Sequence, residues 1–302
     1  MRKLSFVFIL LALVACKRGT KKGAVVETRT SGTTTILVDE SFDRVLDDQI
    51  TVFKSDYPDA TVTTILGNEN KILPDLLNGK VQVIILSRML KPAEEQYYSH
   101  KKIPIYTDRF AIDGIALITN AANIDSNITA NEVFDIMKGK GKGDKKLVFD
   151  NAYSSTIRYF KDSANVDKLP ENGVYTLQTN NDVIKYVAEH KDYIGVVGIN
   201  WLLKENSQEG LSSLSKIKIM GVKNIEGKKG GDAFYKPTQN NLINGDYPFL
   251  RNIYIINCEG RDGLGTGFAN WLTSPRGQLI VLKSGLGPHK MLSREFNLKT
   301  TN

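Results

Sequence analysis

Residues 149–162 of the chain read "FDNAYSSTIRYFKD". A predicted strand over 146–150 ends in a polar turn, and an amphipathic helix predicted over 155–164 follows at once. Hydroxyl side chains stand in a row where this helix begins: Ser154, Ser155 and Thr156. One hydroxyl is enough to cap a helix, whereas several beside free backbone N–H groups suit an anion. This stretch alone leaves both interpretations open.

The same alternation of strand and helix extends to both sides of this stretch. We predict strands over 33–39, 60–66, 81–86, 114–120, 146–150, 174–178, 193–198 and 216–222. Helices are predicted between them, over 42–57, 71–77, from Pro92, and over 129–138, 155–164 and 181–190. An extended segment over 247–257 and one long helix over about 266–284 complete the chain. The pattern predicts an α/β fold of two lobes, each a mostly parallel sheet flanked by helices, with hinge crossings between them.

Polar side chains follow several of these predicted strands. In open α/β sheets, ligands bind beyond the carboxyl ends of the strands. The side chains expected there are Ser41, Asn68, Ser87, Arg88, Ser154, Ser155 and Thr156. Each of them taken alone also fits helix capping or turn chemistry. Together they favour a site for a tetrahedral oxyanion, because a guanidinium group and hydroxyls match such a ligand.

The N-terminal segment "MRKLSFVFILLALVAC" predicts an exported protein. Two charged residues precede an apolar run that is too short to span a bilayer and fits a signal peptide. Its end, "LVAC", resembles the lipobox of bacterial lipoproteins, which implies cleavage before Cys16 and diacylglycerol on its sulfur. An ordinary signal peptide with a chance Cys is the alternative. We assign residues 1–15 to the signal peptide and residues 16–32 to a tether.

Composition excludes several classes of protein. Of the 40 Lys and Arg residues, seven lie within residues 1–29 together with one of the 33 acidic residues, which leaves 33 basic and 32 acidic side chains afterwards. A nearly neutral body argues against binding of nucleic acid. If Cys16 carries lipid, Cys258 has no partner for a disulfide. The His residues are isolated, so we expect no metal and no cofactor.

The chain resembles the substrate-binding proteins of phosphate ABC importers, the PstS-like group of type 2 periplasmic binding proteins. The resemblance covers nearly all of residues 33–290 and rests on the order of its marks. These are "ESF" (40–42), "LSRML" with "AEE" (86–95), "DGIALITN" (113–120), "ITANEVFDIMKG" (128–139), "YSSTIRYF" (153–160), "YIGVVG" (193–198), "YPFLR" (247–251) and "SPRGQLIVLKSGLGP" (274–288).

This resemblance implies lobes that close over a dehydrated phosphate. Lobe 1 would comprise residues 33–113 and 223–302, and lobe 2 residues 114–222. The phosphate ligands we predict are Ser41, Phe42, Asn68, Ser87, Arg88, Ser154, Ser155 and Thr156. Proton acceptors or supporting residues are predicted among Asp113, Asp150 and Arg158.

The sequence departs from the family pattern at the predicted site. Ser155 stands where the family has Gly between Ser and Thr, and Asp150 stands where many members have Arg. Arg88 occupies the position at which some members have an Asp that accepts the proton of the ligand. Selection of phosphate over sulfate rests on such an acceptor, so the selectivity of this chain stays open.

The leading hypothesis is a monomeric, lipid-anchored protein that binds inorganic phosphate outside the cell or in the periplasm of a bacterium. It would deliver the ligand to an ABC permease and its ATPase, without catalysis. A phosphate sensor is an alternative that the sequence does not separate from transport. A phosphate-ester hydrolase is disfavoured, because it would need a metal cluster or an activated nucleophile and neither pattern occurs.

Overall fold

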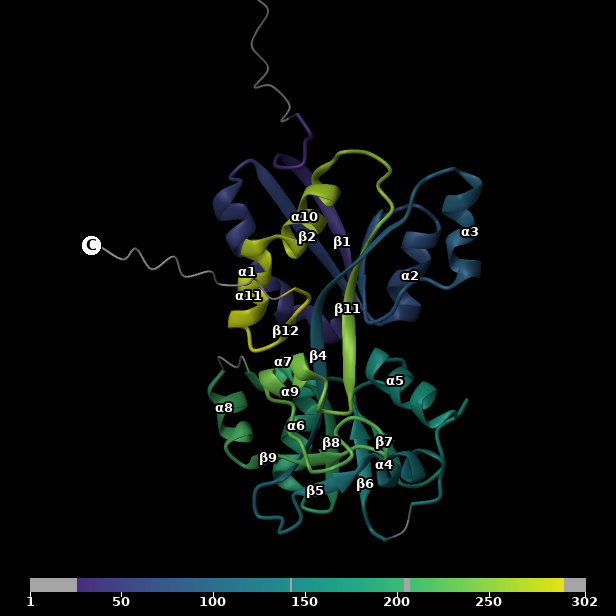
Figure 1. The fold of residues 1–302 in the computed structure, drawn as a ribbon, viewed down its shortest axis with the longest axis vertical. Coiled ribbons are helices and arrows are strands. Elements are labelled where there is room, and N and C mark those ends of the chain that lie inside the picture. The colour runs from purple at the N-terminus through teal and green to yellow at the C-terminus, as the bar shows by residue number, and fades with distance from the viewer. Residues whose placement is uncertain (1–25, 142, 204–206, 291–302) are drawn as a thin grey trace, which may run out of the picture.

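The computed structural model describes residues 26–141, 143–203 and 207–290. Within these residues the long sheet has the strand order β2-β1-β3-β11-β4-β8-β6-β7, and β12 and β9 pair with β4. The signal peptide and Cys16 lie outside the described residues. Figure 1 shows two lobes stacked along the long axis of the molecule. The predicted fold class, an α/β fold of two lobes, is confirmed.

The upper lobe in Figure 1 contains the first elements of the chain, and we call it lobe 1. Its parallel strands pair through β1, with β2 on one side and β3 on the other. Strand β3 is buried along its whole length, as expected for a strand covered on both faces. Its elements are β1 (Gly32–Asp39), η1 (Glu40–Phe42), α1 (Asp43–Asp56), β2 (Ala60–Gly67), α2 (Glu69–Leu77), β3 (Val83–Leu86) and α3 (Pro92–His100).

The lower lobe, which we call lobe 2, repeats this pattern. Strand β6 pairs in parallel with both β7 and β8. A small separate sheet joins β10 to β5. The elements of lobe 2 are β5 (Asn127–Thr129), α4 (Ala130–Met137), β6 (Lys146–Phe149), α5 (Ser155–Ala164), β7 (Val174–Thr176), α6 (Asn180–Glu189), β8 (Tyr193–Gly198), α7 (Asn200–Leu203), α8 (Gln208–Leu214), β9 (Ile217–Ile219) and β10 (Gly221–Lys223).

A single long strand, β4 (Tyr106–Asn120), joins the lobes. Its first part pairs antiparallel with β11 (Leu250–Asn257) as far as Gly114, and from Ile115 onward it pairs antiparallel with β8. The remaining elements are α9 (Gln239–Asn244), α10 (Leu264–Thr273), α11 (Pro275–Lys283) and β12 (Gly287–Pro288). The chain therefore passes from lobe 1 into lobe 2 within the continuous strand β4, and the exact lobe boundaries stay a prediction.

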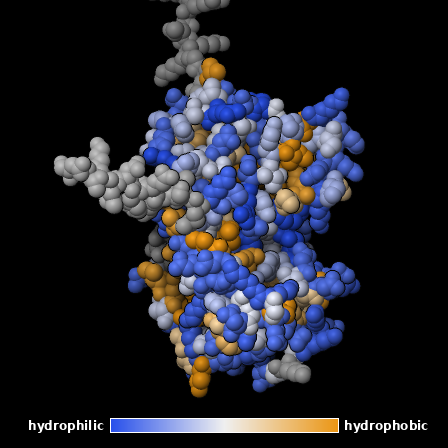
Figure 2. All heavy atoms as spheres, in the orientation of Figure 1, coloured by the Kyte–Doolittle hydropathy of each residue, from blue (hydrophilic) through white to orange (hydrophobic). Residues whose placement is uncertain are grey.

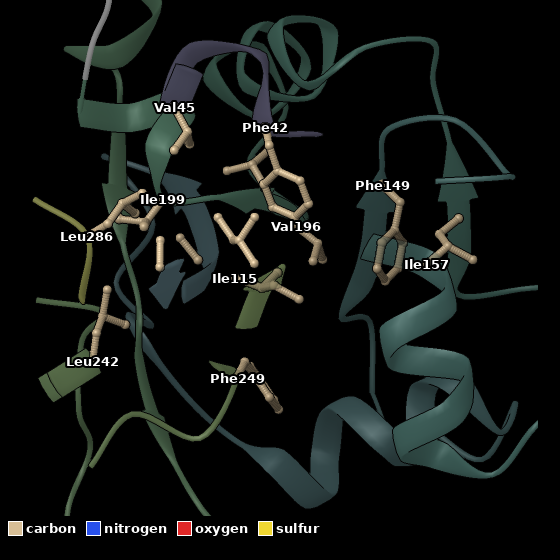
Figure 3. Close-up of a cluster of buried hydrophobic side chains, with 14 of the residues drawn as sticks. Phe42, Val45, Ile115, Phe149, Ile157, Val196, Ile199, Leu242, Phe249 and Leu286 are labelled. Carbon is tan, nitrogen blue, oxygen red and sulfur yellow. The ribbon is translucent and has the colours of Figure 1, made fainter. Parts of the chain in front are cut away.

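The hydrophobic core is continuous across the crossing. Figure 3 shows Phe42 from lobe 1 beside Val196 and Ile115, and all of these side chains are fully buried. Phe149 and Ile157, on either side of the polar turn of lobe 2, belong to the same buried cluster. The turn that carries the predicted site residues is therefore fixed by apolar side chains before and after it.

Several sequence predictions are wrong in detail. The long C-terminal helix is two helices, α10 and α11, because Pro275 occupies the first position of a new helix capped by Ser274. The strand predicted over 216–222 is divided into β9 and β10, which pair with different partners. The strand predicted from residue 114 begins at Tyr106.

The surface visible in Figure 2 is mainly hydrophilic, with hydrophobic side chains in scattered groups. Among the residues that the structure describes, there is no helix with both the length and the apolar character needed to cross a membrane.

Candidate ligand-binding site

A buried ion pair lies where the chain crosses between the lobes. Arg251, near the start of β11, stands directly opposite Asp113 of β4 in the antiparallel register. The Arg251 Nε atom lies 2.8 Å from Asp113 Oδ2, and the two side chains are 1% and 0% exposed. Burial raises the pKa of Asp113, and the charge and hydrogen bond of Arg251 oppose that rise. The pair holds a guanidinium group in the interior of the protein.

The other end of this guanidinium points to the hydroxyls at the start of α5. Arg251 Nη1 donates to Thr156 Oγ1 at 3.0 Å and to Ser155 Oγ at 3.3 Å. The guanidinium carbon lies 4.6 Å from the centre of the Phe42 ring, a cation–π arrangement. Gly198 leaves room for this group, because a Cβ there would lie 2.8 Å from Arg251 Nη2.

Lobe 1 reaches the same point through Ser41. The Ser41 and Ser155 hydroxyl oxygens, one from each lobe, lie 3.3 Å apart. The backbone N–H of Ser41 donates to Asp39 Oδ1, and its carbonyl oxygen accepts from Asn200 Nδ2 and from Trp201 Nε1. The lobes are therefore in contact through hydroxyl and backbone groups around the ion pair.

Asp150 directly follows β6, in the turn that leads into α5, and is buried. Its Oδ2 atom accepts from Asn180 Nδ2 at 3.1 Å. Burial raises the pKa of Asp150 to about 7, the Ser154 hydroxyl and Arg251 oppose the rise, and the charges of Asp39 and Glu40 add to it. A carboxyl group with this pKa exists in both protonation states near neutral pH.

Several polar atoms of this cluster are buried and have no hydrogen-bond partner within the protein. They are Asp39 Oδ2, Asp113 Oδ1, Asp150 Oδ1, Asn180 Oδ1, Asn200 Oδ1 and Arg251 Nη2. Buried polar atoms in native proteins are normally satisfied, so this concentration makes the cluster our candidate place for a polar ligand. The carboxylate and amide oxygens of this cluster accept hydrogen bonds, and the guanidinium and hydroxyls of the cluster donate them. We call this set of residues, with Ser41, Ser155 and Thr156, the central cluster.

The three hydroxyls of the opening stretch have different partners. Ser154 is the N-cap of α5, and its Oγ atom accepts from the backbone N–H of Ile157 at 3.2 Å. Ser155 and Thr156 are fully buried and face the guanidinium of Arg251. Capping thus explains Ser154 only, and the other two hydroxyls belong to the central cluster.

Other predicted ligands lie outside the central cluster contacts. Asn68 caps α2 by accepting from the backbone N–H of Lys71. Ser87 accepts from Arg158 Nη2 at 2.7 Å. Arg88 donates to both carboxylate oxygens of Glu94, at 2.7 and 3.0 Å, because its guanidinium and the carboxylate pair side by side. The guanidinium that contacts the α5 hydroxyls is that of Arg251, and the role of Arg88 as a ligand stays a prediction.

Sequence reasoning missed Arg251, Asp39, Asn180 and Asn200. The signal for Arg251 was available, because an arginine inside the apolar segment "YPFLRNIYIIN" needs a buried partner. Asp113 stands in the equally apolar "FAIDGIALI" and offers that partner. No group of His, Cys, Asp and Glu in the described part of the chain is arranged to hold a metal ion.

Two sequence comparisons find relatives of this chain. Residues 24–276 match the sequence model of the PBP superfamily domain. The phosphate-binding protein PstS of Pseudomonas aeruginosa is 25% identical over 274 residues, which are 78% of this chain and 76% of that protein.

Solved structures share the fold. A proposed phosphate ABC transporter substrate-binding protein from Clostridium perfringens, solved with bound phosphate, aligns with a TM-score of 0.69 and 20% identity over 86% of this chain and 100% of its own. An ABC-type phosphate transport receptor from Vibrio cholerae aligns with a TM-score of 0.63 and 19% identity over 85% of this chain and 100% of its own.

Proposed function

Because the chain belongs to the PBP superfamily, whose domain model covers residues 24–276, we propose that it binds inorganic phosphate between its lobes and delivers it to an ABC importer. Support comes from the names of the relatives, which include a phosphate-binding protein and a phosphate transport receptor. The observation that carries the proposal is the central cluster. There a buried guanidinium and the hydroxyls of Ser41, Ser155 and Thr156 meet from both lobes.

The chemistry of the central cluster suits a tetrahedral oxyanion. The free Nη2 atom of Arg251 and the neighbouring hydroxyls supply donors to ligand oxygens. Helix α5 directs its N-terminus to the same place, and a helix N-terminus favours negative charge. We assign Ser41, Ser155, Thr156 and Arg251 as the ligand donors, with Phe42 beneath the guanidinium.

Acceptor atoms in the central cluster favour phosphate over sulfate. Asp39 and Asp150 each present a carboxylate oxygen that has no partner within the protein. Phosphate near neutral pH carries at least one proton that such an oxygen can accept in a hydrogen bond, whereas sulfate carries none. A carboxylate facing sulfate would add unrelieved repulsion in a buried place. These acidic residues are our proposed source of selectivity, with Asp113 neutralised by Arg251.

Calorimetric titration of the purified protein with phosphate, sulfate and a phosphate monoester tests this function. We expect saturable 1:1 binding of phosphate, with sulfate at least about tenfold weaker. The monoester should bind weakly, because its organic group has no place among buried side chains. Equal affinity for sulfate and phosphate would refute the assigned role of the acidic residues. Absence of phosphate binding would refute the function itself.

We further propose that the protein is an exported lipoprotein anchored through Cys16, which lies outside the described residues. The support is the charged start, the short apolar run and the "LVAC" sequence. Cys16→Ser should release the protein from the membrane fraction. A variant that still incorporates labelled fatty acid would contradict the anchor.

A further inference from the structure

A second set of polar contacts joins the lobes outside the central cluster. Arg158, on α5 of lobe 2, extends to lobe 1, where its Nε atom lies 2.8 Å from Glu69 Oε2 on α2. Its Nη2 atom donates to Ser87 Oγ at 2.7 Å. Figure 1 shows α5 directly below α2 at this side of the molecule. One guanidinium thus makes an ion pair and a hydrogen bond across the lobes.

Both members of this ion pair also have a partner on their own lobe. Glu69 lies 3.3 Å from the Nε atom of Arg88, which belongs to lobe 1. Arg158 lies 3.3 Å from Asp162, one turn along the same helix. Separation of the lobes would therefore leave neither Glu69 nor Arg158 without an opposite charge. The contact across the lobes can therefore break without leaving an unpaired buried charge. An unpaired buried charge is what makes breaking an ion pair costly.

Burial makes this contact stronger than an ordinary surface pair. The side chains of Arg158 and Glu69 are 27% and 8% exposed, whereas Asp162 is 68% exposed. Water screens the pair with Asp162 more than the pair with Glu69. Arg158 therefore has a better set of partners when the lobes are together, and its interactions favour that arrangement.

On the other side of the central cluster, an arginine of lobe 1 contacts a residue of lobe 2. Arg44, on α1 of lobe 1, places its guanidinium 4.4 Å from the centre of the Trp201 ring on α7 of lobe 2. Its Nη1 atom donates to the carbonyl oxygen of Trp201 at 3.2 Å. The ligand-binding residues thus lie between two arginine contacts, one reaching from each lobe.

We propose that Arg158 is a positioning residue that sets ligand affinity by favouring closure of the lobes, without contacting the ligand. This inference rests on the proposed function, because it assumes that ligand binds when the lobes are together. A residue that stabilises the binding-competent arrangement raises apparent affinity by increasing the population of that arrangement. The apparent affinity should change by the same factor for every ligand that binds between the closed lobes.

The contact with Asp162 gives a second prediction, which is that its removal does not weaken phosphate binding. Arg158→Gln should weaken phosphate binding by about threefold to tenfold, because it removes interactions made only when the lobes meet. Asp162→Asn should leave affinity unchanged or tighten it by up to about twofold, because it removes the partner that Arg158 keeps when the lobes separate. A purely structural role in α5 would weaken binding in both variants.

The experiment combines calorimetry with small-angle X-ray scattering on the full protein and both variants. Arg276→Gln is the matched control, since Arg276 pairs with Asp56 at 2.8 Å within lobe 1. We expect Arg158→Gln to show a larger radius of gyration at subsaturating phosphate, and the control to match the unmodified protein. Arsenate should lose affinity by the same factor as phosphate.

Each outcome decides one of the two proposals. If the unmodified protein binds phosphate and Arg158→Gln binds it equally well, Arg158 does not favour closure. Equal weakening by Asp162→Asn would also overturn the proposal. If the unmodified protein binds no phosphate, the proposed function fails instead, and scattering of the ligand-free proteins tests Arg158 alone. A radius of gyration unaffected by Arg158→Gln would then refute closure by this residue.

Discussion

The polar turns after β3 and after β6 look alike in sequence and differ in the structure. Both follow a buried strand. The turn after β3 carries one hydroxyl and an arginine, Ser87 and Arg88, and the turn after β6 carries a row of hydroxyls that runs into the helix containing Arg158. After β6, Ser155 and Thr156 face a guanidinium with an unpartnered nitrogen. After β3, Arg88 is paired with Glu94 through two nitrogens and with Glu69 through the third.

The two turns show that carboxylate partners determine whether a guanidinium has nitrogens left for other contacts. Arg88 has acidic residues on both sides, and all of its nitrogens have a partner. Arg251 has Asp113 on its Nε side only, so that Nη1 contacts the α5 hydroxyls and Nη2 has no partner within the protein. A position at a strand end therefore makes an arginine a candidate ligand residue. The carboxylates around it determine whether its guanidinium has a nitrogen without a partner.

The largest expected effect concerns Arg251. Removing it alone would leave Asp113 charged and buried, at a cost of about 3–5 kcal/mol of stability. We therefore combine Arg251→Gln with Asp113→Asn, so that neither member is left as an unpaired charge. The double variant should bind phosphate at least about a hundredfold more weakly, because it lacks the charged donor. Calorimetry measures this loss, and Arg276→Gln, which removes an ion pair of lobe 1 away from the central cluster, serves as the control.

A result within about threefold of the unmodified protein would remove Arg251 from the site. The same result would also remove the contrast between the two turns. Thermal unfolding of the double variant confirms that any loss of binding comes from a folded protein.

The next effect separates the hydroxyls of the β6 turn from one another. Ser155→Ala should reduce phosphate affinity by about tenfold with little change in stability, because its hydroxyl lies between Ser41 and Arg251. Ser154→Ala should instead lower stability by about 1 kcal/mol and leave affinity nearly unchanged, because Ser154 is the helix cap. Denaturant unfolding and titration on the same samples measure both quantities. Loss of affinity in Ser154→Ala alone would reverse the assignment.

Asp150 gives the β6 turn a dependence on pH. Burial raises its pKa to about 7 from an ordinary value of 3.8. A raised pKa in the folded state means that the stabilising contribution is complete below pH 3.8 and is lost as pH rises through about 7. We therefore expect Asp150→Asn to flatten the fall in Tm across this range. Parallel Tm profiles for the two proteins would contradict the raised pKa.

Ligand binding should follow the same titration. Ionisation of Asp150 turns its unpartnered oxygen into an acceptor for a proton of phosphate, so the preference for phosphate over sulfate should increase as pH rises through about 7. In Asp150→Asn this increase should be smaller, because an amide does not ionise in this range. Titrations of both proteins with phosphate and with sulfate at several pH values check this expectation.

The smallest effect is expected at Arg88 itself. Arg88→Gln should change phosphate affinity by less than about threefold, because its partners are carboxylates of lobe 1. Stability should fall modestly, as Glu69 and Glu94 lose a shared partner. A tenfold loss of phosphate affinity would instead show that Arg88 contacts the ligand. Both turns would then contribute to the binding site.

The sequence was sufficient to predict the alternating elements and the turn after β6. Periodicity identifies strands such as β3 because burial on both faces produces a continuous apolar run. It does not reveal which strands pair, so the long β4 and the antiparallel return of β11 were missed. Arg251 and Asp113 are 138 positions apart in sequence and become neighbours only through that pairing. The central cluster therefore depends on register, which periodicity leaves unspecified.

The position of Arg251 has a consequence for the order of events in binding. Arg251 and Asp113 lie where β4 changes partner from β11 to β8, and we propose this point as the pivot between the lobes. A group at a pivot moves little when the lobes swing, whereas Ser41 and Ser155, which come from opposite lobes, approach each other. An incoming anion should therefore meet the guanidinium first and the paired hydroxyls afterwards. Arg251 would govern how fast the ligand arrives, and the hydroxyls would govern how long it stays.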